Sequence, residues 1–372
     1  MTNTAFTPTP ANRLGLDYRS EAERLGPPVT PIIDSHAHIN GAKAAVIYKE
    51  VRDLYGVNLT YSQTRIEDAD AVRDALGDTV RFVAVPRWMH PDRKWAHTTG
   101  YLEDIPVWRE KYGSRMAKFW TAPRLLDYTR EMGDPKLLAL DGEWRRRQMR
   151  LCTELGMMIM VHIADPDTWF KTKYADSSVY GTKESQYLPI ERLADEFTQP
   201  WLLAHMAGWP EDLGFLDGLL SRHPNIVIDT SATKWMVREL SKHAAGRFGE
   251  FLEKHTGRVL FGSDIVTMEQ HLAHKPHGQS DSAAARFAEQ AHSKAEAFDL
   301  YASRYWALRT MFETGYDGES SIADPDLALV EPSRYDEMSA PRLRGMSLPP
   351  SVLRTLYRGA CEGSLEQWWR GR

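Results

Sequence analysis

Five residues at four places in the sequence have the side chains and spacing of a metal site. His36 and His38 stand two residues apart in IIDSHAH, and side chains two apart on a strand point to the same side. His162 ends the run MMIMVH, His205 ends WLLAH, and Asp264 follows VLFGS. Imidazoles presented together suit Zn, Fe, Mn or Ni rather than Ca. The pattern predicts a site for a divalent transition metal.

The runs that carry these residues belong to a longer alternation of strands and helices. Eight short apolar segments are separated by amphipathic stretches: Pro31–His36, Val57–Tyr61, Val80–Val85, Met116–Trp120, Met157–Ile163, Trp201–His205, Ile226–Asp229 and Val259–Gly262. Parallel strands buried on both faces have this length and often lack polar alternation. The order predicts an α/β fold, a (β/α)8 TIM barrel. An open doubly wound sheet is the alternative, although the chain lacks the glycine-rich first turn typical of that fold.

The predicted barrel would bring the candidate ligands together. They end or follow the first, fifth, sixth and eighth strands, and active sites of these barrels form at the carboxyl ends of the strands. A histidine at one strand end is usually a structural residue. Metal-competent side chains at four strand ends favour a functional site.

The chain outside the strands divides into an arm and an extension. We expect an extended N-terminal arm over residues 1–28, the metal-dependent barrel over 29–265, and a C-terminal helical extension packed on the barrel over 266–372. The extension contains a run of large side chains at three- and four-residue steps, typical of one helix face: Phe298, Tyr301, Tyr305, Leu308 and Phe312. This face is expected to pack against the barrel or a second subunit.

Composition narrows the class of protein. Lys and Arg total 46 against 51 Asp and Glu, a formal charge of −5, whereas nucleic-acid-binding proteins usually carry a basic excess. No apolar run approaches the roughly 18 residues of a membrane span. The polar N-terminus lacks the apolar segment of a secretory signal, and Cys152 and Cys361 are too few for a disulfide framework. We therefore expect a cytoplasmic protein with a small-molecule substrate and no nucleic-acid or membrane partner.

The motifs IIDSHAH, MVHIADP, LLAHMAG and LFGSD, in this order, resemble those of the amidohydrolase superfamily, in particular its amidohydrolase-related branch. That branch includes aminocarboxymuconate semialdehyde decarboxylase, aromatic acid decarboxylases and several lactonases. The resemblance covers residues 31–264 and the closing LPPSVLRTLYRGAC. It implies one divalent ion, zinc in the first place with manganese or iron as alternatives, held by His36, His38, His162 and Asp264. It also implies that His205 moves protons beside the metal and that Asp264 is both ligand and proton acceptor.

Lys118 leaves the number of ions open. It lies in AKFW on the fourth predicted strand, where relatives with two metals carry a carbamylated lysine. Many members of the related branch have this lysine and one metal, so the resemblance favours one ion. An unmodified Lys118 would bind a substrate carboxylate or form a buried ion pair.

Several residues after the third and fourth predicted strands are candidates for substrate contacts. Arg87 and Trp88 follow the third strand, and Trp120 ends the fourth. A guanidinium pairs bidentately with a carboxylate, so these residues would suit a planar or apolar acid. A second histidine group, His271, His274 and His277, lies in a polar, loop-like stretch and is expected to be solvated rather than to bind a metal.

The same residues serve two reactions. The leading prediction is a divalent-metal-dependent hydrolase in which metal-activated water attacks a lactone, ester or amide carbonyl. The alternative is a metal-dependent nonoxidative decarboxylase of an aromatic or unsaturated carboxylic acid. A catalytically inert barrel is a third reading, disfavoured because all five site residues are present. The arm, the aromatic helix face and the habit of the family together lead us to expect a homo-oligomer, a dimer.

Overall fold

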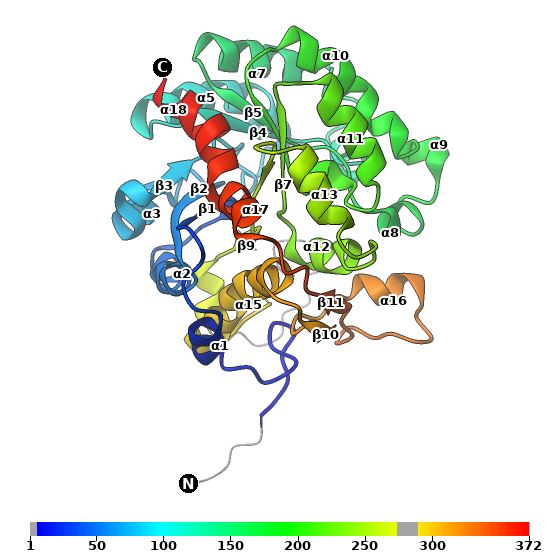
Figure 1. Ribbon diagram of the computed structural model, residues 1–372. Helices are drawn as coiled ribbons and strands as arrows, with labels where there is room; N and C mark the ends of the chain where they lie inside the picture. Colours follow the sequence, from blue (N-terminus) through cyan, green and yellow to red (C-terminus); the bar gives the residue numbers. More distant parts are fainter. Residues whose placement is uncertain (1–5, 274–288, 372) are drawn as a thin grey trace.

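Eight parallel strands form the centre of the protein, seen in a computed structural model that describes residues 6–273 and 289–371 (Figure 1). The strands are β1 (Ile32–His38), β2 (Val57–Ser62), β3 (Val80–Phe82), β4 (Met116–Trp120), β5 (Met158–His162), β6 (Trp201–Leu203), β7 (Ile226–Asp229) and β8 (Val259–Leu260). Two parallel sheets contain them, in the orders β3-β2-β1-β9 and β4-β5-β6-β7-β8, where β9 is Ile265–Val266.

Backbone hydrogen bonds join the two sheets at both edges. The amide of Lys118 donates to the carbonyl of Ala84 (2.9 Å), next to a parallel bridge between Ala84 and Ala117. At the other edge, the amide of Ser35 donates to the carbonyl of Phe261 (2.9 Å). The eight strands therefore close on themselves, and the predicted (β/α)8 barrel is confirmed.

Helices follow the strands and cover the outside of the barrel (Figure 1). The longer ones between β1 and β8 are α2 (Ala42–Leu54), α3 (Ala69–Leu76), α5 (Thr99–Lys111), α7 (Glu143–Glu154), α10 (Leu188–Glu196), α11 (Leu213–Arg222), α12 (Thr233–Leu240) and α13 (Arg247–Lys254). Short helical segments lie in the connections: η1 (Gly77–Thr79), α4 (Arg93–His97), α6 (Leu125–Arg130), α8 (Asp167–Phe170), α9 (Ser177–Tyr180), η2 (Glu184–Tyr187), η3 (Met206–Gly208) and η4 (Glu269–Leu272).

The segment expected to be an extended arm contains a helix, α1 (Tyr18–Leu25). The side chain of Asp17 caps it by accepting from the amides of Arg19 and Ser20, the role that Asp commonly plays at helix starts. The Tyr55 hydroxyl at the end of α2 donates to the carbonyl of Tyr18 (2.9 Å). Part of this segment is therefore folded onto the barrel.

After β8 the chain forms a long helix, α15 (Lys294–Glu313), which packs against α1, α2 and α12. Its large side chains, Phe298, Tyr301, Tyr305, Leu308 and Phe312, are all buried within the chain. This face packs on the barrel, so it is not free for a second subunit. The rest of the extension begins with β10 (Asp317–Glu319), α16 (Asp326–Val330) and β11 (Arg342–Arg344). It ends with α17 (Pro350–Arg354), the π-helical η5 (Thr355–Gly359) and η6 (Glu362–Glu366), and α18 (Gln367–Arg370). These last segments are continuous over residues 350–370 and form the C-terminal helix.

The interior of the barrel is apolar at its amino end. One buried cluster takes residues from each strand or directly beside it, together with three residues of the C-terminal helix: Ile33, Tyr61, Val83, Met116, Met158, Met160, Leu202, Ala204, Val227, Leu260, Ala360, Cys361 and Leu365. The C-terminal helix contacts segments that precede strands, since Trp368 Nε1 donates to the carbonyl of Gly156 (2.9 Å). It therefore closes the amino end of the barrel (red in Figure 1).

His271, expected to be solvated, is buried, and its Nδ1 lies 3.0 Å from the Tyr301 hydroxyl. That expectation was wrong for His271, because α15 covers it. His274 and His277 lie outside the described residues. Over the part of the chain that the structure describes, no helix has the length and apolar character needed to cross a membrane.

Candidate metal centre

Three of the predicted ligands converge at the carboxyl end of the barrel. His36 and His38 come from β1, and Asp264 comes from the turn after β8. Asp264 Oδ1 lies 3.4 Å from His36 Nε2 and 3.2 Å from His38 Nε2, and the three donor atoms lie within 4.8 Å of one another. His36 Nε2 is buried without a hydrogen-bond partner, an arrangement that is costly unless something else binds the atom. Two imidazoles and a carboxylate whose donor atoms converge in this way fit a divalent transition metal.

Asp229, the last residue of β7, orients His36. Its Oδ2 lies 3.0 Å from His36 Nδ1. Burial alone would raise the pKa of Asp229, but the adjacent His36 and the hydrogen bonds that the carboxylate accepts hold that pKa below its usual range. A carboxylate only accepts, so Nδ1 of His36 carries the hydrogen and Nε2 keeps its lone pair. A carboxylate behind a histidine in this way fixes the ring for metal binding.

Ser231 links His205 to the pair formed by His36 and Asp229. Its hydroxyl donates to Asp229 and lies 2.7 Å from His205 Nδ1. Because that hydrogen is used, Nδ1 of His205 donates to Ser231 and Nε2 keeps the lone pair. Burial, followed by the neighbouring His162, keeps the pKa of His205 well below its ordinary value. His205 is therefore a neutral base whose ring centre is 4.8 Å from that of His36.

The backbone around these residues is strained. His205 (φ 61°), Ala232 (φ 64°) and Asp264 (φ 60°) have left-handed conformations, which cost on the order of 1–3 kcal/mol each for such residues. Hydrogen bonds hold two of the turns: the His205 amide donates to Asp229 Oδ1 (2.8 Å), and the Asp264 amide donates to the carbonyl of His36 (2.8 Å). The turns end the strands and direct the side chains over the barrel mouth.

His162 is close but is not in the same donor group. Its ring centre lies 4.5 Å from that of His205, while its Nε2 lies 2.9 Å from Asp165 Oδ1. The Tyr174 hydroxyl donates to the other oxygen of Asp165 (2.7 Å). Since the carboxylate accepts from Nε2, the lone pair of His162 is on Nδ1. Its role as a ligand stays a prediction, and Nδ1 is the atom that would serve.

Lys118 is buried on β4 beside the candidate ligands, with its side chain in the field of Asp229 and Asp264. Burial lowers the pKa of Lys118 to about 8, against the opposing effect of these carboxylates. A fraction of the Lys118 side chains is therefore uncharged near neutral pH. The uncharged amine can form a carbamate, and the charged form can bind a substrate carboxylate.

The other predicted substrate residues lie further along the rim. Arg87 donates to both carboxylate oxygens of Asp104 (2.8 Å each), so two of its nitrogens are already engaged. Trp88 and Trp120 lie in one aromatic group, with ring centres 5.7 Å apart. Their contact with a substrate stays a prediction.

A cavity of about 230 Å³ opens beside Asp264. Trp169, Trp235, Lys234 and Arg304 contribute to its walls. The Trp235 ring is edge-on to His205, with centres 5.5 Å apart. Sequence reasoning did not single out Trp235, Lys234, Arg304 or Asp229. Only Asp229 had a recognisable signal, an acidic residue that ends an apolar strand.

A family model described as Amidohydrolase matches residues 33–301. A solved structure of a probable 2-pyrone-4,6-dicarboxylic acid hydrolase from Acinetobacter baumannii is similar over 74% of this chain and 96% of its own, at 12% identity and a TM-score of 0.39. A 2,6-dihydroxybenzoate decarboxylase from Rhizobium is similar over 75% of this chain and 99% of its own, at 15% identity and a TM-score of 0.37. An amidohydrolase from Burkholderia multivorans is similar over 90% of this chain and 99% of its own, at 13% identity and a TM-score of 0.41. No curated protein matches the sequence.

Proposed function

The chain belongs to the amidohydrolase family, and on this premise we propose that it is a divalent-metal-dependent hydrolase that adds water to the carbonyl of a small lactone, ester or amide. The observation that carries the proposal is the convergence of donor atoms from His36, His38 and Asp264. One of these atoms, Nε2 of His36, is buried without a hydrogen-bond partner. A neutral His205 beside them adds a base at the same place.

His36 and His38 through Nε2 and Asp264 through Oδ1 would hold one ion, with Nδ1 of His162 as the proposed fourth donor. A divalent ion bound there supplies a Lewis acid that polarises a carbonyl and lowers the pKa of water to roughly 7. Zinc is proposed because imidazole and carboxylate ligands suit it, with manganese and iron as alternatives.

His205 is the proposed general base and acid. Its Nε2 would take a proton from the attacking water and return it to the leaving oxygen or nitrogen, while Ser231 and Asp229 keep Nδ1 protonated. An imidazole is suited to both steps because each ring nitrogen has a defined role. Asp264, which is held ionised, is the second proposed proton acceptor.

The test is hydrolysis of a panel of lactones, esters and amides, with released carbon dioxide measured in parallel on aromatic carboxylic acids. We expect hydrolysis that a strong chelator abolishes and that added zinc, manganese or iron restores. Carbon dioxide release without hydrolysis would establish the decarboxylase instead. Activity that the chelator leaves intact would exclude both metal-dependent reactions.

The proposal of one ion is tested at Lys118. We expect about one equivalent of metal in the native chain and in Lys118→Ala. Two equivalents in the native chain that fall in Lys118→Ala would identify a bridging carbamate. The proposal also retains a homodimer and a cytoplasmic location, and light scattering of the purified chain tests the dimer.

A further inference from the structure

Two cations enter the cavity beside Asp264 from different helices. Lys234 lies on α12 and Arg304 on α15, and these helices pack against each other (Figure 1). Both side chains line the same cavity as Asp264. A molecule that fills the cavity therefore meets Asp264 of the candidate metal centre and two positive charges. The Asp326 carboxylate lines the cavity as well.

Among the described residues, neither cation has an ion-pair partner. The one hydrogen bond of the Arg304 guanidinium runs to the hydroxyl of its neighbour Ser303 (3.3 Å). The acids that raise the pKa of Lys234 against the effect of burial are Asp324 and Asp326, and both bind other side chains. Arg238 binds Asp324.

Asp326 is likewise occupied by other donors. It accepts from Trp169 Nε1 (2.7 Å) and lies 3.4 Å from Lys173 Nζ and 3.5 Å from Arg238. Tyr18, Asp264 and Asp324 raise the pKa of Arg304 against the larger effect of burial. Since Asp264 belongs to the metal centre, the two positive charges have no matching anion within residues 6–273 and 289–371.

Keeping these cations out of water has a cost. Burial lowers the pKa of Arg304 to about 10 and lowers that of Lys234 below its ordinary value. Half-buried cations without partners are unusual in a folded interior. An anionic ligand in the cavity would supply the missing partner. Arg87, in contrast, already has Asp104.

The remaining walls restrict the shape of that ligand. Trp169 and Trp235 stand edge to face, with ring centres 5.4 Å apart, and Trp235 also contacts His205. Aromatic walls favour a planar or apolar body. The volume of about 230 Å³ is below the range of roughly 300–1,000 Å³ typical of sites for drug-sized ligands. The ligand is therefore small.

We propose that Arg304 and Lys234 together bind a carboxylate of the substrate, so that the enzyme acts on small planar acids whose reacting carbonyl is separate from that carboxylate. The inference rests on the proposed function for the reaction, but the binding of a carboxylate can be measured without turnover. Arg304 and Lys234 determine specificity in this account and take no part in the proton transfers.

Calorimetric binding of benzoate and of benzamide, its uncharged isostere, to the metal-loaded protein tests the pair. We expect benzoate to bind more tightly than benzamide. Arg304→Gln and Lys234→Gln should each weaken benzoate binding by about 10- to 100-fold, the usual range for losing a hydrogen bond between charged groups. Lys234→Gln provides a second variant in case Arg304→Gln fails to fold, and Arg304→Lys should recover part of the affinity.

Lys242→Gln is the matched control, since Lys242 follows α12 directly but is 62% exposed and pairs with Glu239. It should leave benzoate binding and metal content unchanged. Benzoate affinity that is the same in the native protein and in both folded cavity variants would overturn the proposal and would place the carboxylate on the metal.

A second arm separates this inference from the proposed hydrolysis. With 3-acetoxybenzoate and phenyl acetate as esters, Arg304→Gln should raise KM for the first by about 10-fold or more with kcat largely kept, and should not affect the second. If neither ester is hydrolysed while the benzoate result holds, the hydrolase proposal fails and the carboxylate site stands. If both esters are hydrolysed equally well by native protein and variant, the carboxylate site fails.

Discussion

The two ends of the barrel interior are built from the same strands but differ in chemistry. On β4, Met116 is the first residue and Lys118 lies two residues closer to the carboxyl end. On β7, Val227 and Asp229 are related in the same way. Side chains two apart share one face of a strand, so each of these two strands carries an inward apolar residue followed by an inward polar one. Within one strand, the residue near the amino end therefore belongs to the apolar core, and the residue nearer the carboxyl end belongs to the candidate site.

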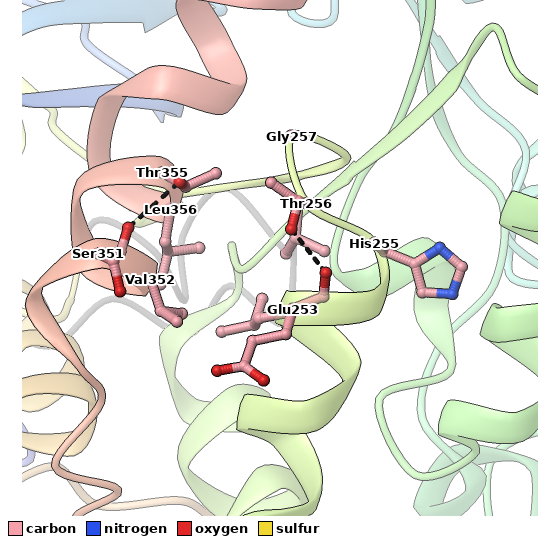
Figure 2. A pocket seen from close by; sticks show the side chains of 10 residues that line it. Glu253, His255, Thr256, Gly257, Ser351, Val352, Thr355 and Leu356 are labelled. Atoms are coloured by element: carbon pink, nitrogen blue, oxygen red, sulfur yellow. Dashed lines mark hydrogen bonds between the residues drawn. The ribbon is translucent and has the colours of Figure 1, made fainter.

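Cavities at the two ends make the same contrast. The amino-end cavity, of about 190 Å³, lies between α13 and the C-terminal helix (Figure 2). Its two threonine hydroxyls bond within their own helical segments: Thr355 donates to the carbonyl of Ser351 and Thr256 to that of Glu253. His255 pairs with Asp217 outside the cavity (2.7 Å). The two volumes are similar, so it is the polar groups without partners, not the space, that indicate a site.

The largest effect is expected from His205→Ala at the carboxyl end. Turnover should fall by about 10²- to 10⁴-fold, the usual contribution of a general acid–base, while the metal content stays unchanged. Elemental analysis and kcat measure the two quantities. His255→Ala is the control at the amino end and should retain turnover. Loss of the metal in His205→Ala would instead make His205 a ligand.

Leu365→Ala tests the amino end. Leu365, on the C-terminal helix, is fully buried against the barrel interior, so its truncation should reduce the free energy of unfolding by about 2–5 kcal/mol. Denaturant unfolding followed by circular dichroism measures this loss. The kcat of the folded fraction should not change. A large change in kcat at full folding would show that the two ends are not independent.

Asp229→Asn should weaken metal binding by about 10- to 100-fold, the range for residues that orient a ligating histidine. The amide can present a hydrogen to His36 Nδ1, which favours the tautomer without a lone pair on Nε2. Competition with a chromogenic chelator measures the affinity. Glu366→Gln is the control: Glu366 is equally buried and accepts from Tyr61 (2.8 Å), but it lies at the amino end. An equal loss of metal affinity in both variants would contradict the separation.

The smallest effect is expected at the rim of the amino-end cavity. Thr256→Val removes a hydroxyl whose hydrogen bond is confined to the end of its own helix. The free energy of unfolding should change by no more than about 0.5 kcal/mol, and kcat/KM should be the same as in the native protein. A clear change in kcat/KM would mean that this cavity also takes part in function.

The barrel was predictable because its strands are continuous apolar runs with a polar residue at the carboxyl end. His36, His38 and Asp264 could be placed together because parallel strands of a barrel end at one rim. The same rule would have found Asp229, which ends β7 as His162 ends β5. The sequence also predicted β6 to extend to His205, whereas the left-handed backbone there ends the strand at Leu203.

The substrate side of the site was less accessible to sequence reasoning. Arg304 lies between Tyr301 and Tyr305 on α15, in a pattern that indicates packing. Its place in the cavity depends on how α15 crosses α12, which is a long-range contact. Trp235 is one of 12 tryptophans, and nothing in its local sequence marks it as the one beside His205. Arg87 was predicted to face a carboxylate, and in the structure it faces that of Asp104.

The most direct test of the account is the metal content of the native chain and of Asp264→Ala after identical purification. The three-donor arrangement predicts about one divalent ion per native chain and little or none in the variant, with both proteins folded by circular dichroism. A native chain without a transition metal, or a variant that keeps its full complement, would contradict a metal centre at the carboxyl end of the barrel.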